Sequence, residues 1–138
     1  IMYTTKDLAI IIPTKDRPDH VKRHLLSLKD QNCAIGRIII VSSGQDISHV
    51  INIFKTTLNI DHYRSAPGQI KQRNLAISKL DNNTKLVATM DDDTIYYKDS
   101  IVNIIQFWNN YKHDIGGVGF NIVNLPSNNH NWFRGLLG

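Results

Sequence analysis

The hydrophobic positions of the chain follow two alternating patterns. Short runs of consecutive aliphatic and β-branched residues recur along the chain, as is typical of strands buried on both faces. Between these runs, apolar residues return every three or four positions, which is the spacing of one face of a helix. The runs predict five strands, over Leu8–Pro13, Arg37–Val41, Ile60–Arg64, Lys85–Met90 and Gly117–Val123.

Four apolar stripes at helical spacing separate these strands and predict four helices. Pro18 falls in the first turn of the first helix, where its missing N–H is not needed, and Asp46 is suited to cap the second. We expect all four stripes to face the core rather than a cofactor. Their members are Val21, Leu25 and Leu28; Ile47, Val50, Ile51, Phe54 and Leu58; Ile70, Asn74, Ile77 and Leu80; and Ile101, Ile104, Ile105 and Trp108.

The strict alternation of strand and helix predicts an α/β fold: a doubly wound, mostly parallel sheet with helices on both faces and right-handed crossovers. The 138 residues correspond to one domain, and no repeat or linker divides them, so we expect a single domain over 1–138. Ligands of such sheets bind beyond the carboxyl ends of the strands. The windows to search are therefore 14–17, 42–46, 65–68, 91–94 and 121–124.

Composition narrows the class of protein. A hydrophobic fraction of 41% argues against disorder, and the single Cys33 excludes a disulfide framework. No apolar run approaches the ~20 residues that span a bilayer, and the start is unlike a signal peptide, so we expect a cytoplasmic location. The net charge of +4 is mild, and no basic run interleaved with aromatic residues occurs. We therefore expect no nucleic-acid partner.

Three consecutive aspartates directly follow the fourth expected strand. Side chains two positions apart share a face, so Asp91 and Asp93 lie about 6–7 Å apart at Cβ and repel each other. A divalent cation would remove that repulsion, since Mg²⁺ or Mn²⁺ binds one or two carboxylates together with substrate phosphates. The alternative is an exposed acidic turn stabilised by the dipole of the next helix. The position at the carboxyl end of a strand favours the metal site.

Basic and polar residues occupy two other windows. Lys71 and Arg73 lie near the start of the third helix, against its dipole, which is reasonable where an anion binds the free N–H groups. Solvated side chains are the alternative, with more weight for Lys71 than for Arg73. After the first strand, Thr14 and Asp16 are suited either to bind a ligand or to cap the helix that follows.

Other chemistries lack support in the sequence. There is no G-x-x-x-x-G-K-[ST] loop, no G-x-G-x-x-G after the first strand and no G-x-S-x-G elbow. His20 and His24 are spaced to share a helix face but lack a third metal ligand, and we expect both at the surface. Cys33 is expected to be a small buried hydrophobe.

Four segments, in this order, resemble glycosyltransferase family 2, which has the GT-A fold: LAIIIPTKDRPDHVKRHLLSLKDQ, IIIVSSGQD, PGQIKQRNLAI and LVATMDDDTIYYKDSI. They cover roughly residues 8–123, and G-x-x-x-x-R-N together with D-x-D is the most specific combination. The resemblance implies binding of a nucleotide-sugar with Mn²⁺ or Mg²⁺. It also implies transfer of the sugar, with inversion, to an unknown glycan or lipid-linked acceptor.

The resemblance also implies roles for individual residues. Pro13 and Thr14 match the strand end that lines the nucleoside pocket, and Arg73 matches an arginine near the base and diphosphate. Asp91 matches a carboxylate near the ribose and sugar, and Asp93 matches the metal ligand. The expected substrate-binding residues are Pro13, Thr14, Asp16, Arg17, Ser42, Arg73, Asp91 and Asp92, the last in a supporting part; the expected metal ligands are Asp93 and Asp91.

Two departures from the family pattern affect these expectations. The acidic residue that usually follows the second strand and contacts the base is replaced by Ser42-Ser43-Gly44, so UDP is only a default donor nucleotide. The family's general base comes from a later segment, and no residue of this chain is assigned to it. Asp99 and Asp114 are expected to be a helix-start residue and a loop residue.

Two alternative functions remain open. A sugar-nucleotidyltransferase would have a glycine-rich basic loop after the first strand, and PTKDRP is not such a loop. A nucleotide-sugar-binding or interaction module would bind without turnover. If the chain is a piece of a longer protein, exposed apolar surface would favour self-association. A role in polysaccharide biosynthesis would fit the cytoplasmic face of a membrane, although no residue anchors the chain there.

Overall fold

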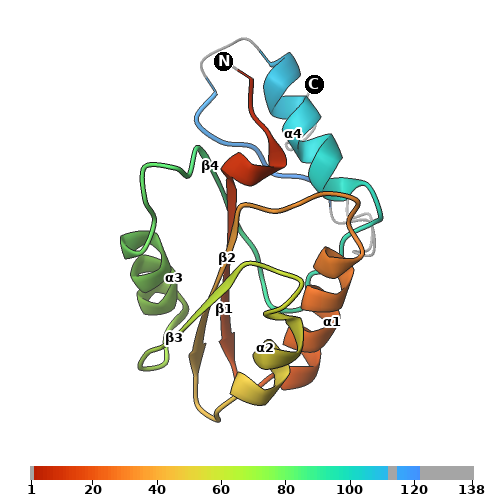
Figure 1. The fold of residues 1–138 in the computed structure, drawn as a ribbon. Helices are drawn as coiled ribbons and strands as arrows, with labels where there is room; N and C mark the ends of the chain where they lie inside the picture. Colours follow the sequence, from red (N-terminus) through yellow and green to blue (C-terminus); the bar gives the residue numbers. More distant parts are fainter. Residues whose placement is uncertain (1, 112–114, 122–138) are drawn as a thin grey trace, which may run out of the picture.

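The computed structural model describes residues 2–111 and 115–121, and it is built on a four-stranded parallel sheet (Figure 1). The strands lie in the order β3-β2-β1-β4. This arrangement, with helices between successive strands, confirms the predicted α/β class. The elements are η1 (Thr5–Asp7), β1 (Leu8–Lys15), α1 (Pro18–Lys29), β2 (Arg37–Ser43), α2 (Ser48–Phe54), β3 (Ile60–Arg64), α3 (Gln69–Ser78), β4 (Leu86–Thr89) and α4 (Ser100–Asn110).

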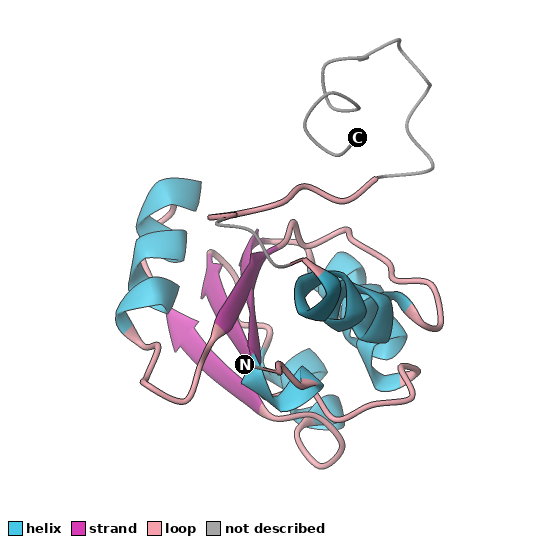
Figure 2. Ribbon diagram, turned by 90° about the horizontal axis from the view of Figure 1, so that it is seen from above, coloured by secondary structure: helices cyan, strands magenta, loops and turns pink. Residues whose placement is uncertain are grey.

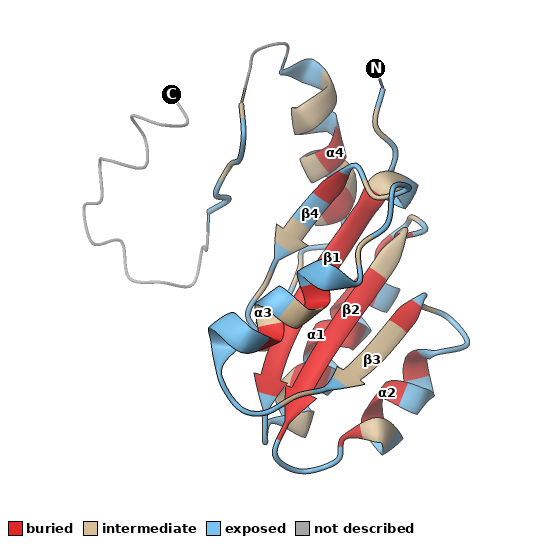
Figure 3. Ribbon diagram, turned by 90° about the vertical axis from the view of Figure 1, so that its left-hand side faces the viewer, coloured by how far each residue is buried: buried red, intermediate tan, exposed pale blue. Residues whose placement is uncertain are grey.

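Helices cover both faces of the sheet: α3 lies on one face, and α1, α2 and α4 lie on the other (Figures 1 and 2). Alternate side chains of the central strands therefore enter different cores. Ile10 and Ile12 of β1 join the large cluster with α1, α2 and α4, whereas Ile11 joins a small cluster with Ala76 of α3. Because both faces are covered, β1 and β2 are buried along almost their whole length and apolar in their middle parts (Figure 3).

The apolar stripes predicted for α1, α2 and α4 are confirmed, but the stripe predicted for α3 is wrong. Ile70 and Ile77 are 76% and 50% exposed, and the residues that α3 buries are Gln72 and Ala76. The small side chain of Ala76 packs against the sheet beside Ile11, Ile39 and Val41, while the Gln72 amide donates to strand carbonyl groups. The inward face of α3 is thus small and polar rather than aliphatic.

The expected fifth strand is not found in residues 117–121, and residues 122 and 123 lie outside the described residues, as does Asp114. Gly117 and Gly119 bring no side chains to pack on a sheet. Phe120 instead stacks edge-on against Phe107 of α4, with ring centroids 5.6 Å apart. The described sheet therefore ends at β4.

Three smaller expectations meet different outcomes. Asp46 accepts hydrogen bonds from the Ser48 N–H and hydroxyl, although the N-cap position of α2 is Ile47. Asp99 does start α4, at its N-cap. Cys33 is a free, half-buried thiol that packs against the large core.

His24 contradicts the expectation of a surface histidine, because it is fully buried. Its ring contacts Tyr96 from the segment that follows β4, so tertiary packing covers this side of α1. Within the described parts of the chain, no helix combines the length and apolar character needed to cross a membrane.

Candidate functional site

A stagger between two neighbouring strands creates the candidate site. β4 pairs with β1 only as far as Ile11, whereas β1 runs on beside β2 to Lys15. On the side away from β2, the carboxyl half of β1 therefore borders the turn that begins at Asp91 rather than a strand. A cavity of about 300 Å³ lies at this edge, lined by Pro13, Thr14, Lys15, Arg17, Gln69, Gln72, Asp91, Asp92 and Asp93.

The three aspartates play two different parts. Asp92 is buried. One of its carboxylate oxygens accepts from the Thr14 hydroxyl at 2.8 Å, and the other lies 3.3 Å from an Arg17 guanidinium nitrogen. Asp91 and Asp93 are exposed at the cavity. Asp92 thus anchors the turn to β1 and to the start of α1, while the carboxylates of its two neighbours remain exposed at the cavity.

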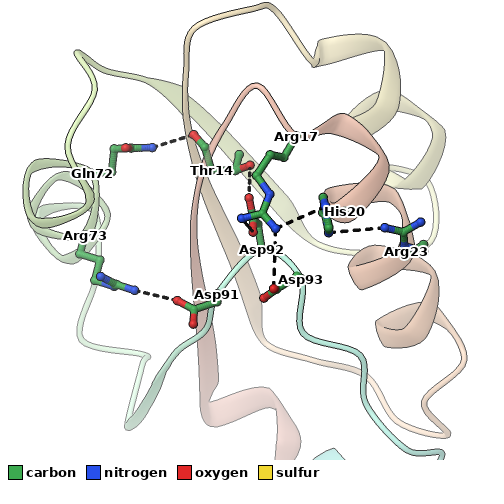
Figure 4. A network of polar contacts seen from close by, with 9 residues as sticks. All are labelled: Thr14, Arg17, His20, Arg23, Gln72, Arg73, Asp91, Asp92 and Asp93. Carbon is green, nitrogen blue, oxygen red and sulfur yellow. Dashed lines mark hydrogen bonds and ion pairs between the residues drawn. The ribbon is translucent and has the colours of Figure 1, made fainter. Parts of the chain in front are cut away.

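Two arginines face the acidic triad (Asp91–Asp93) from opposite sides (Figure 4). Arg73 of α3 lies 3.1 Å from Asp91, and Arg17 lies 3.7 Å from Asp93. Together with Lys15, which also lines the cavity, three basic side chains lie around the three carboxylates. The same guanidinium groups are suited to bind phosphate oxygens.

Gln72 fixes α3 to the ends of two strands. Its Nε2 donates to the carbonyl oxygens of Thr14 and Val41, each at 2.8 Å, and its Oε1 accepts from the Gly68 N–H at 3.3 Å. Gly68 adopts a φ of 141°, a backbone conformation that favours glycine. Together these contacts bring Gln69, the first residue of α3, to the cavity.

Three of the expected binding residues, Asp16, Ser42 and Arg73, do not line this cavity, and of these only Arg73 pairs with a lining residue, Asp91. Asp16, with a φ of 54°, accepts from the Gln45 N–H at 2.7 Å and lies against Gly44, where a Cβ would collide with its carboxylate. The buried Ser42 hydroxyl contacts His62 Nε2 at 2.7 Å. Asp16 therefore holds the loop after β2, whereas Ser42 links β2 to β3.

The structure brings together most of the other residues expected from the sequence. Pro13, Thr14, Arg17 and the acidic triad line one cavity, and Arg73 is joined to it through Asp91. Sequence reasoning missed Lys15, Gln69 and Gln72. For Gln72 the available signal was its spacing of four residues from Ala76, which places a polar and a small residue on one helix face.

Burial changes the titration of the groups beneath the triad. Desolvation lowers the pKa of His24 to about 4, while the backbone of Asp92 and Asp91 and the charge of Asp93 act in the opposite direction. Burial also raises the pKa of Tyr96, whose hydroxyl lies 3.0 Å from His24 Nε2. Near the loop after β2, desolvation and then the charge of Arg64 lower the pKa of His62.

The donor set of the site suits a hard divalent cation. Asp91 and Asp93 supply only carboxylate oxygens, which Mg²⁺ and Mn²⁺ accept together with water and substrate phosphate. Across residues 2–111 and 115–121, no three His, Cys, Asp or Glu side chains gather to hold a metal by themselves. Any cation at this edge would therefore complete its coordination with water or with a substrate.

Comparison with known proteins gives the class of the chain. The sequence model of the family "Glycosyl transferase family 2" matches residues 9–136, and the chain belongs to this family. The resemblance found from the four sequence segments is thereby confirmed. A search of curated proteins found no match.

Solved structures of S. aureus TarS share the fold. The structure of TarS 1-349 in complex with UDP aligns with a TM-score of 0.68 and 18% identity over 83% of this chain and 38% of that chain. Its complex with UDP-GlcNAc gives 0.67 and 18% over 83% and 37%. A further TarS structure gives 0.64 and 19% over 72% and 19%. The chain thus spans less than two fifths of the length of these proteins.

Proposed function

We propose that this chain is the nucleotide-sugar-binding part of a metal-dependent glycosyltransferase, with a UDP-sugar as the default donor. The observation that carries the proposal is the cavity where Asp91 and Asp93 face Arg73 and Arg17 at the carboxyl end of the sheet. Membership of glycosyl transferase family 2 supports it. The UDP and UDP-GlcNAc bound in TarS structures of the same fold favour this donor class.

The chemistry of glycosyl transfer explains why such residues would be needed. Negative charge builds on the diphosphate as its bond to the sugar breaks, so groups that stabilise this charge lower the barrier. Arg73 and Arg17 would bind phosphate oxygens, and the first N–H groups of α3 would add their partial positive charge. A cation held by Asp91 and Asp93 would supply Lewis-acid stabilisation of the leaving diphosphate.

Transfer also requires an acceptor hydroxyl and, for the inverting reaction we propose, a general base that deprotonates it. We assign no described residue to that role. Asp92 is engaged with Thr14 and Arg17, and Asp91 and Asp93 are the ligands proposed for the cation. A chain that binds the donor without transferring or hydrolysing it would be a binding module instead.

Thermal unfolding with UDP, GDP, CDP and dTDP, each with and without Mn²⁺, tests the proposal. A ligand at a hundred times its Kd stabilises the folded state by about 2.7 kcal/mol, which is readily detected as a rise in Tm. We expect UDP to raise Tm only with the metal. If a different nucleotide raises Tm with the same metal dependence, the proposed donor base is wrong and the rest of the proposal stands.

A matched pair of variants identifies the metal ligand. Asp93 and Asp81 have side chains 55% and 57% exposed, and each faces an arginine, at 3.7 and 4.0 Å. Asp93→Asn should abolish the metal-dependent rise in Tm, while Asp81→Asn, far from the cavity, should keep it. The proposal fails if no nucleotide stabilises the wild-type chain with Mn²⁺ or Mg²⁺, or if both variants behave alike.

A further inference from the structure

α1 and the turn that follows it bury three polar side chains along one side. His24 and Ser27 of α1 and Gln31, two residues beyond its end, are each at least nine-tenths buried, and they form a column in which the Gln31 amide donates to the Ser27 carbonyl. Burying polar groups costs free energy unless they are hydrogen-bonded, so a helix normally uses apolar residues here. The column therefore calls for specific partners.

Besides local bonds from Ser27 and Gln31 to carbonyl oxygens of α1, all three side chains have partners in the segment that follows the acidic triad. His24 Nε2 lies 3.0 Å from the Tyr96 hydroxyl, and the Ser27 hydroxyl oxygen accepts from the Tyr96 N–H at 3.2 Å. The Gln31 amide donates to the Tyr97 carbonyl at 2.8 Å and accepts from the Ile101 N–H at 3.2 Å. The column thus binds the segment from Tyr96 to the first turn of α4.

The same helix holds the other side of the triad. Arg17, at the N-cap of α1, pairs with Asp92 and Asp93. The turn that contains the triad lies beyond the end of β4 and is closed by a hydrogen bond from the Thr94 N–H to the Asp91 carbonyl.

We propose that His24, Ser27 and Gln31 are positioning residues that fix the segment after the triad and thereby the directions of the Asp91 and Asp93 carboxylates. The inference rests on the proposed function and names three residues that act on its site without touching the ligand. A metal site needs its ligands held to within about 0.5 Å. Because hydrogen bonds are directional, a polar column sets the register of the segment, which apolar packing alone would not do.

Two amide side chains of this chain provide a matched comparison. Gln31 bridges two backbone groups of the segment after the triad, and Asn109, on the last turn of α4, bridges the N–H and carbonyl of Tyr3. Gln31→Met and Asn109→Leu each remove such a bridge while keeping similar side-chain volume. Both are expected to lower stability, but only Gln31→Met should disturb the triad.

The first measurement needs no ligand. The Thr94 amide is hydrogen-bonded to the Asp91 carbonyl and the Tyr96 amide to the Ser27 hydroxyl. Hydrogen exchange at these two amides should be about tenfold faster in Gln31→Met than in Asn109→Leu. Equal exchange at both amides in the two variants overturns the proposal. If Gln31→Met does not fold, Tyr96→Phe removes the hydroxyl that contacts His24, and Tyr3→Phe is its control.

The second measurement is calorimetric binding of UDP with and without Mn²⁺. In Gln31→Met the Kd with Mn²⁺ should rise about tenfold, whereas in Asn109→Leu it should change less than about twofold. Faster exchange with an unchanged metal-dependent Kd overturns the claim that the column positions the carboxylates. A wild-type chain that binds no nucleotide refutes the proposed function instead, and the exchange comparison still decides whether the column fixes the triad.

Discussion

On the face of the sheet covered by α1, α2 and α4, 17 buried apolar residues of the described chain form one core, whereas the α3 face holds four. The strands that separate the two are the same, so the difference comes from the helices. α1 and α4 present aliphatic stripes to the sheet, while α3 presents an amide and an alanine and leaves two isoleucines in solvent.

This difference assigns most of the stability to one face, while elements on both faces contribute residues to the candidate site. Apolar burial on the large face supplies most of the folding free energy. The α3 face contributes little to that burial, but it provides Gln69, Gln72 and Arg73 at the cavity edge. Substitutions on the large face should therefore lower stability most, and those on the outer surface of α3 should lower it least.

The largest effect is expected for Leu25→Ala on the large face. Leu25 is fully buried on α1, and truncating such a leucine removes apolar contacts and leaves a cavity. The free energy of unfolding should fall by about 2–5 kcal/mol in urea denaturation, with an unchanged m value. A loss below about 1 kcal/mol would mean that the large face is not the main source of stability.

The pH dependence of stability should follow from His24 on the same helix. Its folded pKa of about 4 lies below the ordinary value of 6.5, so between these pH values the unfolded chain binds a proton that the folded chain does not. As pH falls from 6.5 to 4, the free energy of unfolding should drop by about 3 kcal/mol through this residue.

The measurement compares urea denaturation of the wild type and His24→Gln across this range, with EDTA present so that no metal contributes. The groups that face the His24 ring, Tyr96 and the acidic triad, are left unchanged in both proteins. The difference in stability between the two proteins should narrow as pH falls. A constant difference from pH 7 to 4 would show that His24 titrates normally in the folded chain.

A smaller effect is expected for Gln72→Leu on the α3 face. The change leaves the Thr14 and Val41 carbonyl oxygens without their amide donor, which should cost about 1–3 kcal/mol of unfolding free energy. Asn74→Leu, at an exposed position of the same helix, is the control and should change stability by about 0.5 kcal/mol or less. Equal losses of unfolding free energy in Gln72→Leu and Asn74→Leu would show that the hydrogen bonds of the buried Gln72 amide do not stabilise the fold.

The smallest effect is expected for Ile77→Ala on the outer surface of α3. Ile77 is half exposed and alanine is the better helix former, so chemical denaturation should detect a change of about 0.5 kcal/mol or less. A clearly larger loss that grows with protein concentration would show that this surface is covered by another copy of the chain. Sedimentation velocity would then detect the association.

The sequence predicted the fold well where the hydrophobic pattern had one explanation. The unbroken apolar runs of β1 and β2 required two covered faces, and the stripe around Leu25 required a core-facing helix. On α3, Ile70 and Ile77 formed an equally good stripe, but the close packing of Ala76 and the hydrogen bonds of Gln72 decided its orientation. Such contacts depend on residues distant in the chain, which a periodic pattern does not contain.

The candidate site was predictable to a similar degree. The rule that ligands bind beyond the carboxyl ends of parallel strands led to Thr14, Arg17 and the acidic triad. It did not distinguish Asp16, which bonds the neighbouring loop, from residues that line the cavity. His24 was misassigned because its burial depends on Tyr96, 72 positions further along the chain.

The stagger between β1 and β4 has a consequence for how this chain can vary in evolution. Each residue added to or removed from β4 would shift the triad by roughly 3.3 Å and exchange inward and outward side chains. Asp92 would then leave Thr14, and its neighbours would turn away from the cavity. Insertions and deletions should therefore accumulate in the exposed loop at 81–84 before β4 and be excluded between Leu86 and Asp93.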